Sequence, residues 1–198
     1  GDGHQVVVYD GAGIFSAARV WWTFRLMGKL DVAVLDGGLP KWQAEGREIE
    51  DMPPIIRDRH MTVSRQNQLV KDVTQVAHAA KLGEAEILDA RSAARFRGEA
   101  PEPRAGLRSG HIPGSKNIPF AEVLNPDGTM KEPAALKAVF QAAGVDLTKP
   151  AITSCGSGVT AAILSLALER IGHRNHALYD GSWSEWGMYD DLRVATGP

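Results

Sequence analysis

The sequence predicts an α/β protein with a parallel sheet flanked by helices, arranged as two tandem repeats of which the first is truncated at its N-terminal side. Short apolar runs alternate with segments of helical periodicity, a pattern typical of strand–helix–strand units in parallel sheets. The chain also repeats internally. A shift of 144 residues aligns the segment that begins at Val7 with the segment that begins at Ala151, without a gap.

Small and aromatic residues keep this register across both copies. The matched pairs are Ser16-Ala17-Ala18 with Thr160-Ala161-Ala162, Gly28 with Gly172, Asp36-Gly37 with Asp180-Gly181, and Trp42 with Trp186. Each copy is therefore predicted to run as strand, tight loop, helix, strand, turn and aromatic helix. Only the second copy has a long preceding segment, so we expect roughly 70–80 further residues before Gly1, in the same protein or as another chain.

The first repeat and a linker are predicted to occupy the first third of the chain. The apolar runs are typical of strands buried on both faces, and Gly28 is suited to end the helix. The expected elements are strands at Gln5–Tyr9 and Val32–Leu35 and a helix at Phe15–Met27. We assign residues 1–50 to the C-terminal part of the first repeat and the polar, proline-containing residues 51–71 to an interdomain linker.

Residues 72–198 are assigned to the complete second repeat. Asp72 is suited to cap its first helix, which then runs through Leu82. Three prolines interrupt the stretch Arg91–Ser115, which is therefore expected to be a long loop. The other expected elements are strands at Glu86–Asp89, Ala151–Ser154 and His176–Tyr179 and helices at Pro133–Ala143 and Val159–Ile171.

The composition of the 198 residues excludes several classes of protein. The 22 Lys and Arg residues nearly balance the 24 Asp and Glu residues, so we expect no basic surface for nucleic acid or for an anionic membrane. No apolar run approaches the ~18–20 residues of a membrane helix. The single cysteine, Cys155, cannot form an internal disulfide, so it is either a buried apolar side chain or a reactive thiol.

Cys155 opens a glycine-rich loop between a predicted strand and a predicted helix, where α/β folds bind ligands. Glycines let successive backbone N–H groups point inward, and together with the helix N-terminus these groups favour an anion at the loop's centre. We therefore expect Cys155 to react as a thiolate and the loop to stabilise the thiolate and then a persulfide. The loop reads Cys155-Gly156-Ser157-Gly158-Val159-Thr160-Ala161.

Three other interpretations fit parts of this loop. A cysteine beside a turn is often simply buried. The glycines Gly156 and Gly158 also satisfy a dinucleotide-binding pattern, but only 18 residues follow Asp180, too few to complete a nucleotide-binding sheet. A cysteine phosphatase needs an arginine that closes the loop on phosphate, and Ala161 occupies that position.

A second feature is a loop rich in arginine, proline and glycine. Guanidinium groups bind carboxylates and sulfonates through paired hydrogen bonds, so this loop is predicted to hold an anionic substrate. Its arginines are Arg91, Arg95, Arg97, Arg104 and Arg108. The following His111 is expected to order the loop rather than to act as a base. His173 and His176 lack metal-ligand spacing, so no metal and no cofactor is expected.

Three motifs together resemble the tandem-rhodanese sulfurtransferases. They are the loop at Cys155, the sequence Gly110-His111-Ile112-Pro113-Gly114, and Tyr179-Asp180-Gly181-Ser182-Trp183-Ser184-Glu185-Trp186. Within this family the loop is similar to that of the 3-mercaptopyruvate branch, whereas the thiosulfate branch typically has basic residues after the cysteine. Val6–Gly46 resembles the end of the inactive first domain, where Gly11 stands opposite Cys155.

The resemblance implies a rhodanese-like fold and a sulfur-transfer reaction. Cys155 would take sulfur from 3-mercaptopyruvate as a persulfide, release pyruvate, and pass the sulfur to cyanide or to a thiol acceptor such as thioredoxin. Arg95 and Arg104 would bind the substrate, and Ser157 would help to deprotonate or orient its thiol. The substrate site would also include Gly156, Gly158, Val159 and Thr160. Transfer from thiosulfate, or a binding module without catalysis, is the alternative.

The resemblance also bears on partners and location. The family's site lies between two domains and takes an acidic residue and a histidine from the early first domain, in the region before Gly1. A single reduced cysteine is typical of the cytoplasm, with the mitochondrion as the alternative in a eukaryote.

Overall fold

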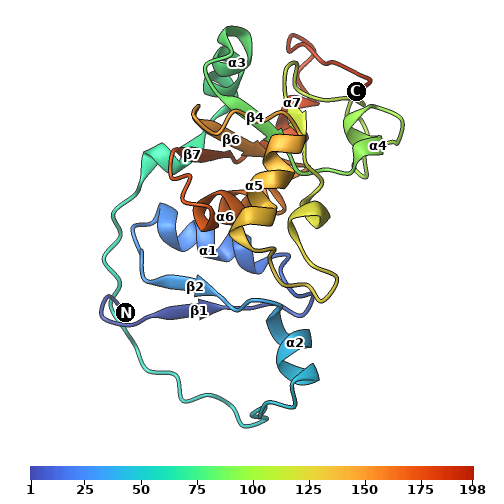
Figure 1. Cartoon of the computed structure of the whole chain (residues 1–198). Helices are drawn as coiled ribbons and strands as arrows, with labels where there is room; N and C mark the ends of the chain where they lie inside the picture. The colour runs from blue at the N-terminus through green and yellow to red at the C-terminus, as the bar shows by residue number, and fades with distance from the viewer.

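The computed structural model describes residues 1–198 and contains two sheets, each made of parallel strands (Figure 1). The smaller sheet pairs β1 (Val6–Val8) with β2 (Val32–Val34). The larger sheet has five parallel strands in the order β3-β7-β6-β4-β5. Their bounds are Val70–Lys71 for β3, His176–Tyr179 for β7, Ala151–Ser154 for β6, Glu86–Asp89 for β4 and Lys116–Asn117 for β5. The predicted α/β class with a parallel sheet is confirmed.

Helices cover both faces of the larger sheet (Figure 1). Because successive strand residues point to opposite faces, Ile87 packs with α3 and α7, whereas Leu88 packs with α5 and α6. The sheet is therefore apolar on both sides, as a fully covered parallel sheet must be. The helices are α3 (Val73–Leu82), α7 (Ser182–Trp186), α5 (Pro133–Ala142) and α6 (Ala161–Arg170).

Helix α1 (Ala17–Leu26) joins the two sheets into one structure. It lies between α6 and the two-stranded sheet, and α2 (Gly38–Ala44) follows β2 (Figure 1). Trp21 and Trp22 are buried in the same apolar cluster as the inner face of α6. The Trp22 indole N–H also donates to the carbonyl of Leu69, at 3.1 Å. The first repeat is thus packed against the helical face of the second.

The elements of the two repeats keep the 144-residue offset found in the sequence. α1 and α6 have the same length and start 144 residues apart, and each follows a strand and a tight loop. β1 pairs with β2 in parallel, as β6 pairs with β7. The loop that begins at Asp10 in the first repeat therefore corresponds to the loop around Cys155 in the second.

Three local predictions are wrong. β1 is not buried on both faces, because no layer covers the outer side of the two-stranded sheet: Val7 is 53% exposed and Tyr9 59% exposed. Val70–Lys71, predicted as linker, form β3 and pair with β7. The arginine-rich loop is interrupted by a single helical turn, α4 (Ala93–Phe96).

The predicted helix signals are found at α3 and α5. Asp72 caps α3 by accepting the Gln75 N–H at 2.9 Å, and the Gln75 side chain accepts the Asp72 N–H at 3.1 Å. This reciprocal pair satisfies two N–H groups that have no partner inside the helix. Gly83, at φ +66°, ends α3, and Pro133 occupies the first turn of α5.

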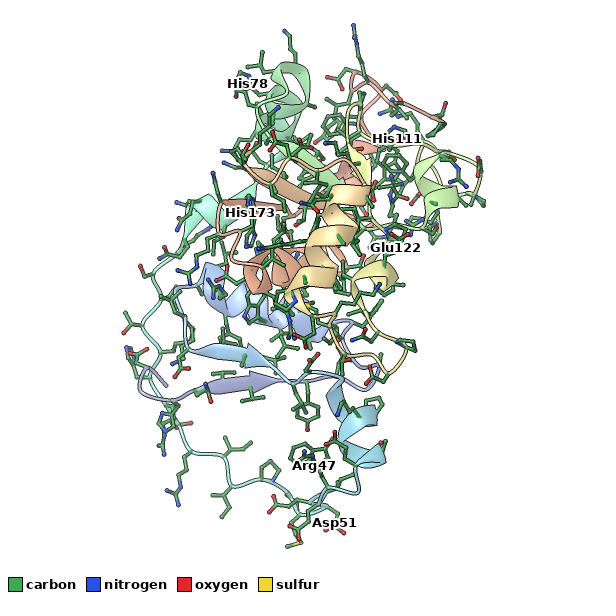
Figure 2. All side chains as sticks on the ribbon, viewed as in Figure 1. Arg47, Asp51, His78, His111, Glu122 and His173 are labelled. Atoms are coloured by element: carbon green, nitrogen blue, oxygen red, sulfur yellow. The ribbon has the colours of Figure 1, made fainter.

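The segment that follows α2 runs along the outside of the molecule. Residues 43–60 are all exposed, and Figure 2 marks Arg47 and Asp51 on this stretch, far from the five-stranded sheet. This exposure is typical of a polar connecting segment. None of the helices has the length and apolar character needed to cross a bilayer.

Candidate active site

The Cys155 loop connects the carboxyl end of β6 to α6. The Cys155 Sγ atom accepts hydrogen bonds from the backbone N–H groups of Gly158, at 3.1 Å, and Ser157, at 3.4 Å. Gly158 has φ +79°, a conformation that glycine adopts at no steric cost, and this turns its N–H toward the sulfur. Cys155 is only 2% exposed, yet its sulfur faces these two N–H groups, as expected for a loop whose N–H groups point inward.

The start of α7 holds the loop from behind. Its N–H groups at Trp183 and Ser184 donate to the carbonyls of Cys155 and Gly156, both at 2.9 Å. The Ser182 hydroxyl accepts the Cys155 N–H at 3.2 Å and donates to the Tyr179 carbonyl at 2.9 Å. These bonds hold the backbone of the loop in place, while the N–H groups of Ser157 and Gly158 face the sulfur.

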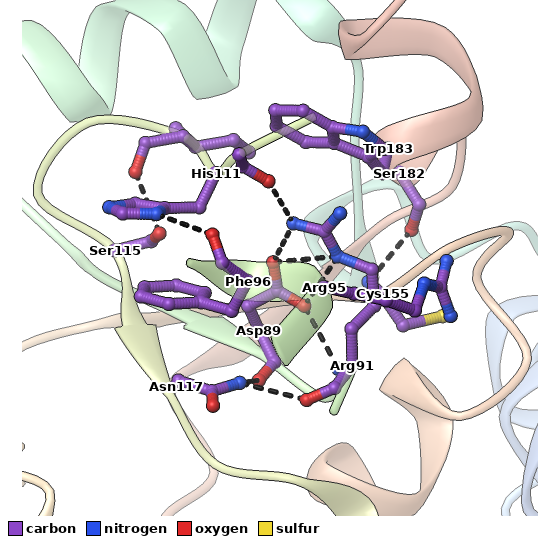
Figure 3. A network of polar contacts seen from close by, with 12 residues as sticks. Asp89, Arg91, Arg95, Phe96, His111, Ser115, Asn117, Cys155, Ser182 and Trp183 are labelled. Carbon is purple, nitrogen blue, oxygen red and sulfur yellow. Dashed lines mark hydrogen bonds and ion pairs between the residues drawn. The ribbon is translucent and has the colours of Figure 1, made fainter. Parts of the chain in front are cut away.

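A cavity of about 290 Å³ opens in front of this sulfur. Cys155 and Arg95 both border it, and Figure 3 draws these two residues next to each other. The cavity is lined by Phe15, Arg95, Glu102, Pro103, Arg104, Leu107, Cys155, Gly156, Ser157, Val159, Thr160 and Ser184. The structure therefore places every predicted site residue in the lining of this cavity except Gly158. Gly158 contacts the sulfur through its backbone N–H but does not line the cavity.

Arg95 and Arg104 each have one fixed contact and free donors. Arg95 pairs with Glu102 through Nε, at 3.2 Å, and Nη2, at 2.5 Å, which leaves Nη1 without a protein partner. Arg104 donates from Nη1 to the Ser184 hydroxyl at 2.6 Å, which leaves Nε and Nη2 free. Two guanidinium groups with unused N–H donors thus border a small cavity that also contains a thiol.

Arg91 anchors this arrangement from the interior (Figure 3). Its side chain is fully buried, binds Asp89 at 2.6 Å and Glu102 at 2.8 Å, and stacks on Trp183 with 4.3 Å from Cζ to the ring centre. Burial by itself lowers the pKa of Arg91, but the charges and hydrogen bonds of Asp89 and Glu102 outweigh burial and raise it. Arg91 therefore stays charged and keeps Glu102 in place for Arg95.

The other two arginines of the loop lie outside the cavity. Arg97 pairs with Glu99 on the surface, at 2.8 Å. Arg108 donates to backbone carbonyls beyond α7, including that of Leu192 at 2.8 Å. Within the arginine cluster, only Arg95 and Arg104 are placed to meet a ligand.

His111 orders the loop, as predicted. Its ring is buried, stacks on Phe96 with 3.7 Å between ring centres, and its Nδ1 atom lies 2.8 Å from the Phe96 carbonyl oxygen. Ser115 closes the following turn by donating to the Ile112 carbonyl at 2.7 Å.

The glycines of the Cys155 loop make room for arginine side chains. A Cβ on Gly156 would lie 2.9 Å from Arg95 Nη2, and a Cβ on Gly158 would lie 2.7 Å from Arg19 Nη1. A dinucleotide fingerprint uses its glycines instead to admit a pyrophosphate. Here guanidinium groups and the cysteine sulfur occupy that space, so the dinucleotide interpretation has no support.

Sequence reasoning missed several residues of the site. Phe15, from the first repeat, also lines the cavity. The repeat register could have indicated it, because Phe15 corresponds to Val159, a predicted site residue. Glu102 and Ser184 hold the two arginines. Glu102 lies between two prolines, which predict a stiff loop but no role for the carboxylate, and Ser184 has no charged or reactive group that would mark it as an arginine partner.

The corresponding loop of the first repeat is filled by a side chain of the protein. The Asp10 carboxylate accepts the backbone N–H groups of Ala12, Phe15 and Ala17, each at 2.8 Å. Partial burial raises the pKa of Asp10, but these N–H groups outweigh burial and hold the pKa below its usual value. Asp10 also fixes the start of α1 and, through its bond to the N–H of Phe15, a wall of the Cys155 cavity.

The chain is similar to proteins of a known family. A profile of the rhodanese-like domain matches residues 1–45 and 72–189. The chain is 44% identical over 211 residues to thiosulfate/3-mercaptopyruvate sulfurtransferase 1, mitochondrial, of Arabidopsis thaliana, covering 96% of this chain and 56% of that protein. It is also 44% identical to 3-mercaptopyruvate sulfurtransferase of Escherichia coli K12, covering 96% of this chain and 67% of that protein.

A thiosulfate sulfurtransferase from Bos taurus is equally similar, at 44% identity over 92% of this chain and 62% of that protein. The chain thus spans between about half and two thirds of the length of these relatives. Among solved structures, SseA from Escherichia coli, a 3-mercaptopyruvate sulfotransferase, matches with a TM-score of 0.81 and 41% identity, over 91% of this chain and 67% of that chain. The resemblance seen in the motifs is confirmed: this chain belongs to the rhodanese-like family.

Proposed function

We propose that this chain carries the catalytic loop of a sulfurtransferase that moves sulfur from 3-mercaptopyruvate through a persulfide on Cys155. The main support is the position of the sulfur, which accepts two backbone N–H groups at the base of a cavity bordered by Arg95 and Arg104. Relatives named as 3-mercaptopyruvate sulfurtransferases support the same substrate.

In the proposed reaction, the Cys155 thiolate attacks the sulfur atom of 3-mercaptopyruvate. A sulfur–sulfur bond forms and the carbon–sulfur bond breaks, so its electron pair passes to the carbon and gives the enolate of pyruvate. A proton then converts the enolate into pyruvate. Cys155 keeps the transferred sulfur as a persulfide, which is a covalent intermediate.

Arg95 and Arg104 are proposed to bind the carboxylate and the keto oxygen of the substrate. The free Nη1 of Arg95 and the free Nε and Nη2 of Arg104 supply the donors. Because negative charge grows on the keto oxygen as the carbon–sulfur bond breaks, donors fixed beforehand bind the transition state better than the substrate. Ser157, exposed at the cavity rim, is proposed to orient the substrate thiol or to accept its proton.

The second half-reaction returns Cys155 to its thiolate form. An acceptor nucleophile attacks the outer sulfur of the persulfide, and the electron pair of the sulfur–sulfur bond returns to Cys155. Cyanide would leave as thiocyanate, and a thiol acceptor such as thioredoxin would leave as a persulfide. The N–H groups of Ser157 and Gly158 support the leaving thiolate.

Thiosulfate is the second candidate donor. Relatives named as thiosulfate sulfurtransferases are as similar as those of the mercaptopyruvate group. The two residues after Cys155 favour the keto acid. Gly156 has no side chain, so Arg95 can lie against it, and Ser157 has no positive charge that would bind a dianion such as thiosulfate.

The test is to incubate the intact protein with 3-mercaptopyruvate alone and then to analyse its peptides by mass spectrometry. We expect the peptide that contains Cys155 to gain one sulfur atom, pyruvate to appear in equal amount, and a thiol reductant to remove the sulfur. The Cys155→Ser variant should gain none. An unmodified Cys155 peptide, with pyruvate formed or not, would contradict the assignment.

A two-domain organisation is a further part of the proposal. Residues 1–50 are proposed to be part of a first rhodanese domain and residues 72–198 the catalytic second domain, joined by a linker that ends before β3 (Val70–Lys71). Val7 and Tyr9 are exposed on a sheet of only two strands, which is marginal by itself. We propose that further rhodanese-type chain, in the same polypeptide or as a partner, covers this face.

A reducing compartment is proposed for the working protein, because the persulfide cycle needs a free thiol. The cytoplasm is the first candidate. The mitochondrion is the second, since one relative is named as mitochondrial. Fractionation of the source cells, followed by detection of the protein, distinguishes the two.

A further inference from the structure

Arg19 reaches from the first repeat to the back of the Cys155 loop. Its Nη1 atom donates to the carbonyl oxygen of Gly158 at 3.3 Å, and its Nη2 atom pairs with Asp180 at 2.6 Å. The guanidinium carbon lies 4.6 Å from the ring centre of Trp22, one turn further along α1. The stacking and the two contacts fix the orientation of the planar group.

The contact with Gly158 adds a bond from the other repeat to those that hold the loop. The carbonyls of Cys155 and Gly156 are bound by α7, which belongs to the same repeat as the loop. The Gly158 carbonyl is bound by Arg19, which belongs to the other repeat. The N–H of this same glycine makes the shorter of the two bonds to Cys155 Sγ, at 3.1 Å.

We infer that Arg19 is a positioning residue for sulfur transfer: it fixes Gly158 so that the N–H of this residue points at the sulfur of Cys155. The inference goes beyond the proposed function, and its turnover readout rests on that function. Arg19 itself does not border the cavity, so it would act through the loop and not on the substrate.

This role differs from that of a simple contact between repeats. Surface ion pairs contribute little to global stability, and the side chains of Arg19 and Asp180 are 28% and 53% exposed. Loss of Arg19 should therefore change the reactivity of Cys155 more than it changes the melting temperature.

Arg25 offers a matched control on the same helix. It also stacks on a tryptophan, with 5.1 Å to the ring centre of Trp21, and also pairs across the repeats, with Glu169 at 3.2 Å. Its side chain is 23% exposed, close to the value for Arg19. Arg25 contacts α6 and not the Cys155 loop, so the two arginines differ in the feature that the inference depends on.

The experiment compares Arg19→Ala, Arg19→Lys and Arg25→Ala in the intact protein. The first readout is the rate at which iodoacetamide alkylates Cys155 at neutral pH, followed by mass spectrometry of its peptide. We expect Arg19→Ala to slow alkylation about three- to tenfold, the effect of one hydrogen bond to the reacting group. Arg25→Ala should react as wild type, and Arg19→Lys, which keeps the charge, should recover part of the rate.

The second readout is steady-state turnover of 3-mercaptopyruvate. We expect Arg19→Ala to lower kcat by a similar factor with KM little changed, because Arg19 does not touch the substrate. Melting temperatures should fall equally in Arg19→Ala and Arg25→Ala. Asp180→Asn, which removes the ion pair but leaves the Gly158 contact, should lie between wild type and Arg19→Ala.

Equal alkylation rates in the wild type, Arg19→Ala and Arg25→Ala would overturn the inference. So would equal losses in the two alanine variants, because these would indicate packing between repeats only. If Arg19→Ala does not fold, the alkylation rates of Arg19→Lys and Asp180→Asn are compared with that of Arg25→Ala. Rates equal to that of Arg25→Ala would overturn the inference. Alkylation needs no sulfur donor, so this test holds even if the wild type fails to form a persulfide, which would contradict the proposed function instead.

Discussion

The guanidinium group of Arg95 lies against the backbone of Gly156, with Nη2 only 2.9 Å from the point that a Cβ on this glycine would occupy. Any side chain at position 156 must therefore displace Arg95 from its place beside Cys155. The residue that follows Cys155 and the position of a proposed substrate-binding arginine are thus coupled.

This coupling predicts the effect of substitutions in the loop. Gly156→Ala should lower kcat/KM for 3-mercaptopyruvate about tenfold by moving one donor, and should lower it less for thiosulfate. The double variant Gly156→Arg with Ser157→Lys should shift the ratio of the two kcat/KM values toward thiosulfate. The control is Gly11→Ala in the first repeat, where a Cβ meets no atom within 4 Å. An unchanged ratio in the double variant would contradict the specificity argument.

The two cavity arginines should be distinguishable from the rest of their loop. Arg95→Ala and Arg104→Ala should each lower kcat/KM for 3-mercaptopyruvate by about 100-fold, the usual effect of removing a donor to developing negative charge. Arg97→Ala, which removes a surface ion pair with Glu99, should leave kcat/KM unchanged. The measurement is pyruvate release. Wild-type kinetics in both cavity variants would remove these arginines from the site.

Glu102 should stabilise the fold as well as the site, because it binds both Arg91 and Arg95 and its side chain is only 2% exposed. Glu102→Gln removes the counter-charge of Arg95 and one of the two counter-charges of the buried Arg91. We expect a loss of about 1–3 kcal/mol in the free energy of unfolding, measured by denaturant titration. Glu99→Gln is the exposed counterpart and should cost less than ~0.5 kcal/mol. Equal losses in the two variants would contradict the bridging role.

Asp10 should make stability depend on pH at the acid end. Its folded-state pKa is lowered, so its contribution is fully present above the unfolded value near 3.8 and is lost as pH falls through the folded value. Asp10→Asn should lower the free energy of unfolding at neutral pH by about 0.5–2 kcal/mol, as for other lost helix caps, and flatten the acid limb of the stability curve. Asp31→Asn, an exposed carboxylate in the same repeat, is the control. An unchanged acid limb in Asp10→Asn would count against the role of the carboxylate.

The sequence predicted most of the second repeat because local signals and packing agree there. The strands Glu86–Asp89, Ala151–Ser154 and His176–Tyr179 have the predicted bounds and are buried at every position. Apolar runs indicate burial but not how many faces are covered. For this reason β1, with an equally apolar sequence, was wrongly expected to be buried on both faces.

Within the candidate site, the sequence identified the charged and thiol residues that border the cavity better than the residues that hold them in place. Cys155, Arg95 and Arg104 carry reactive or charged groups in recognisable motifs. Phe15 and Arg19 come from the other repeat, more than 130 residues away in the chain, and act through contacts that only the packing of α1 against α6 creates. Ordinary apolar and surface residues of this kind give no local signal of their role.

The loop at Asp10 has a consequence for how the two halves of the molecule behave. Its carboxylate is a tethered ligand: it occupies the cradle of N–H groups permanently and cannot dissociate. That half is therefore preorganised at all substrate concentrations and presents α1, Phe15 and Arg19 in fixed positions. In the proposed function, Cys155 in the other loop gains and loses a sulfur atom, so the half with the filled loop is a fixed support for the half that changes during the reaction.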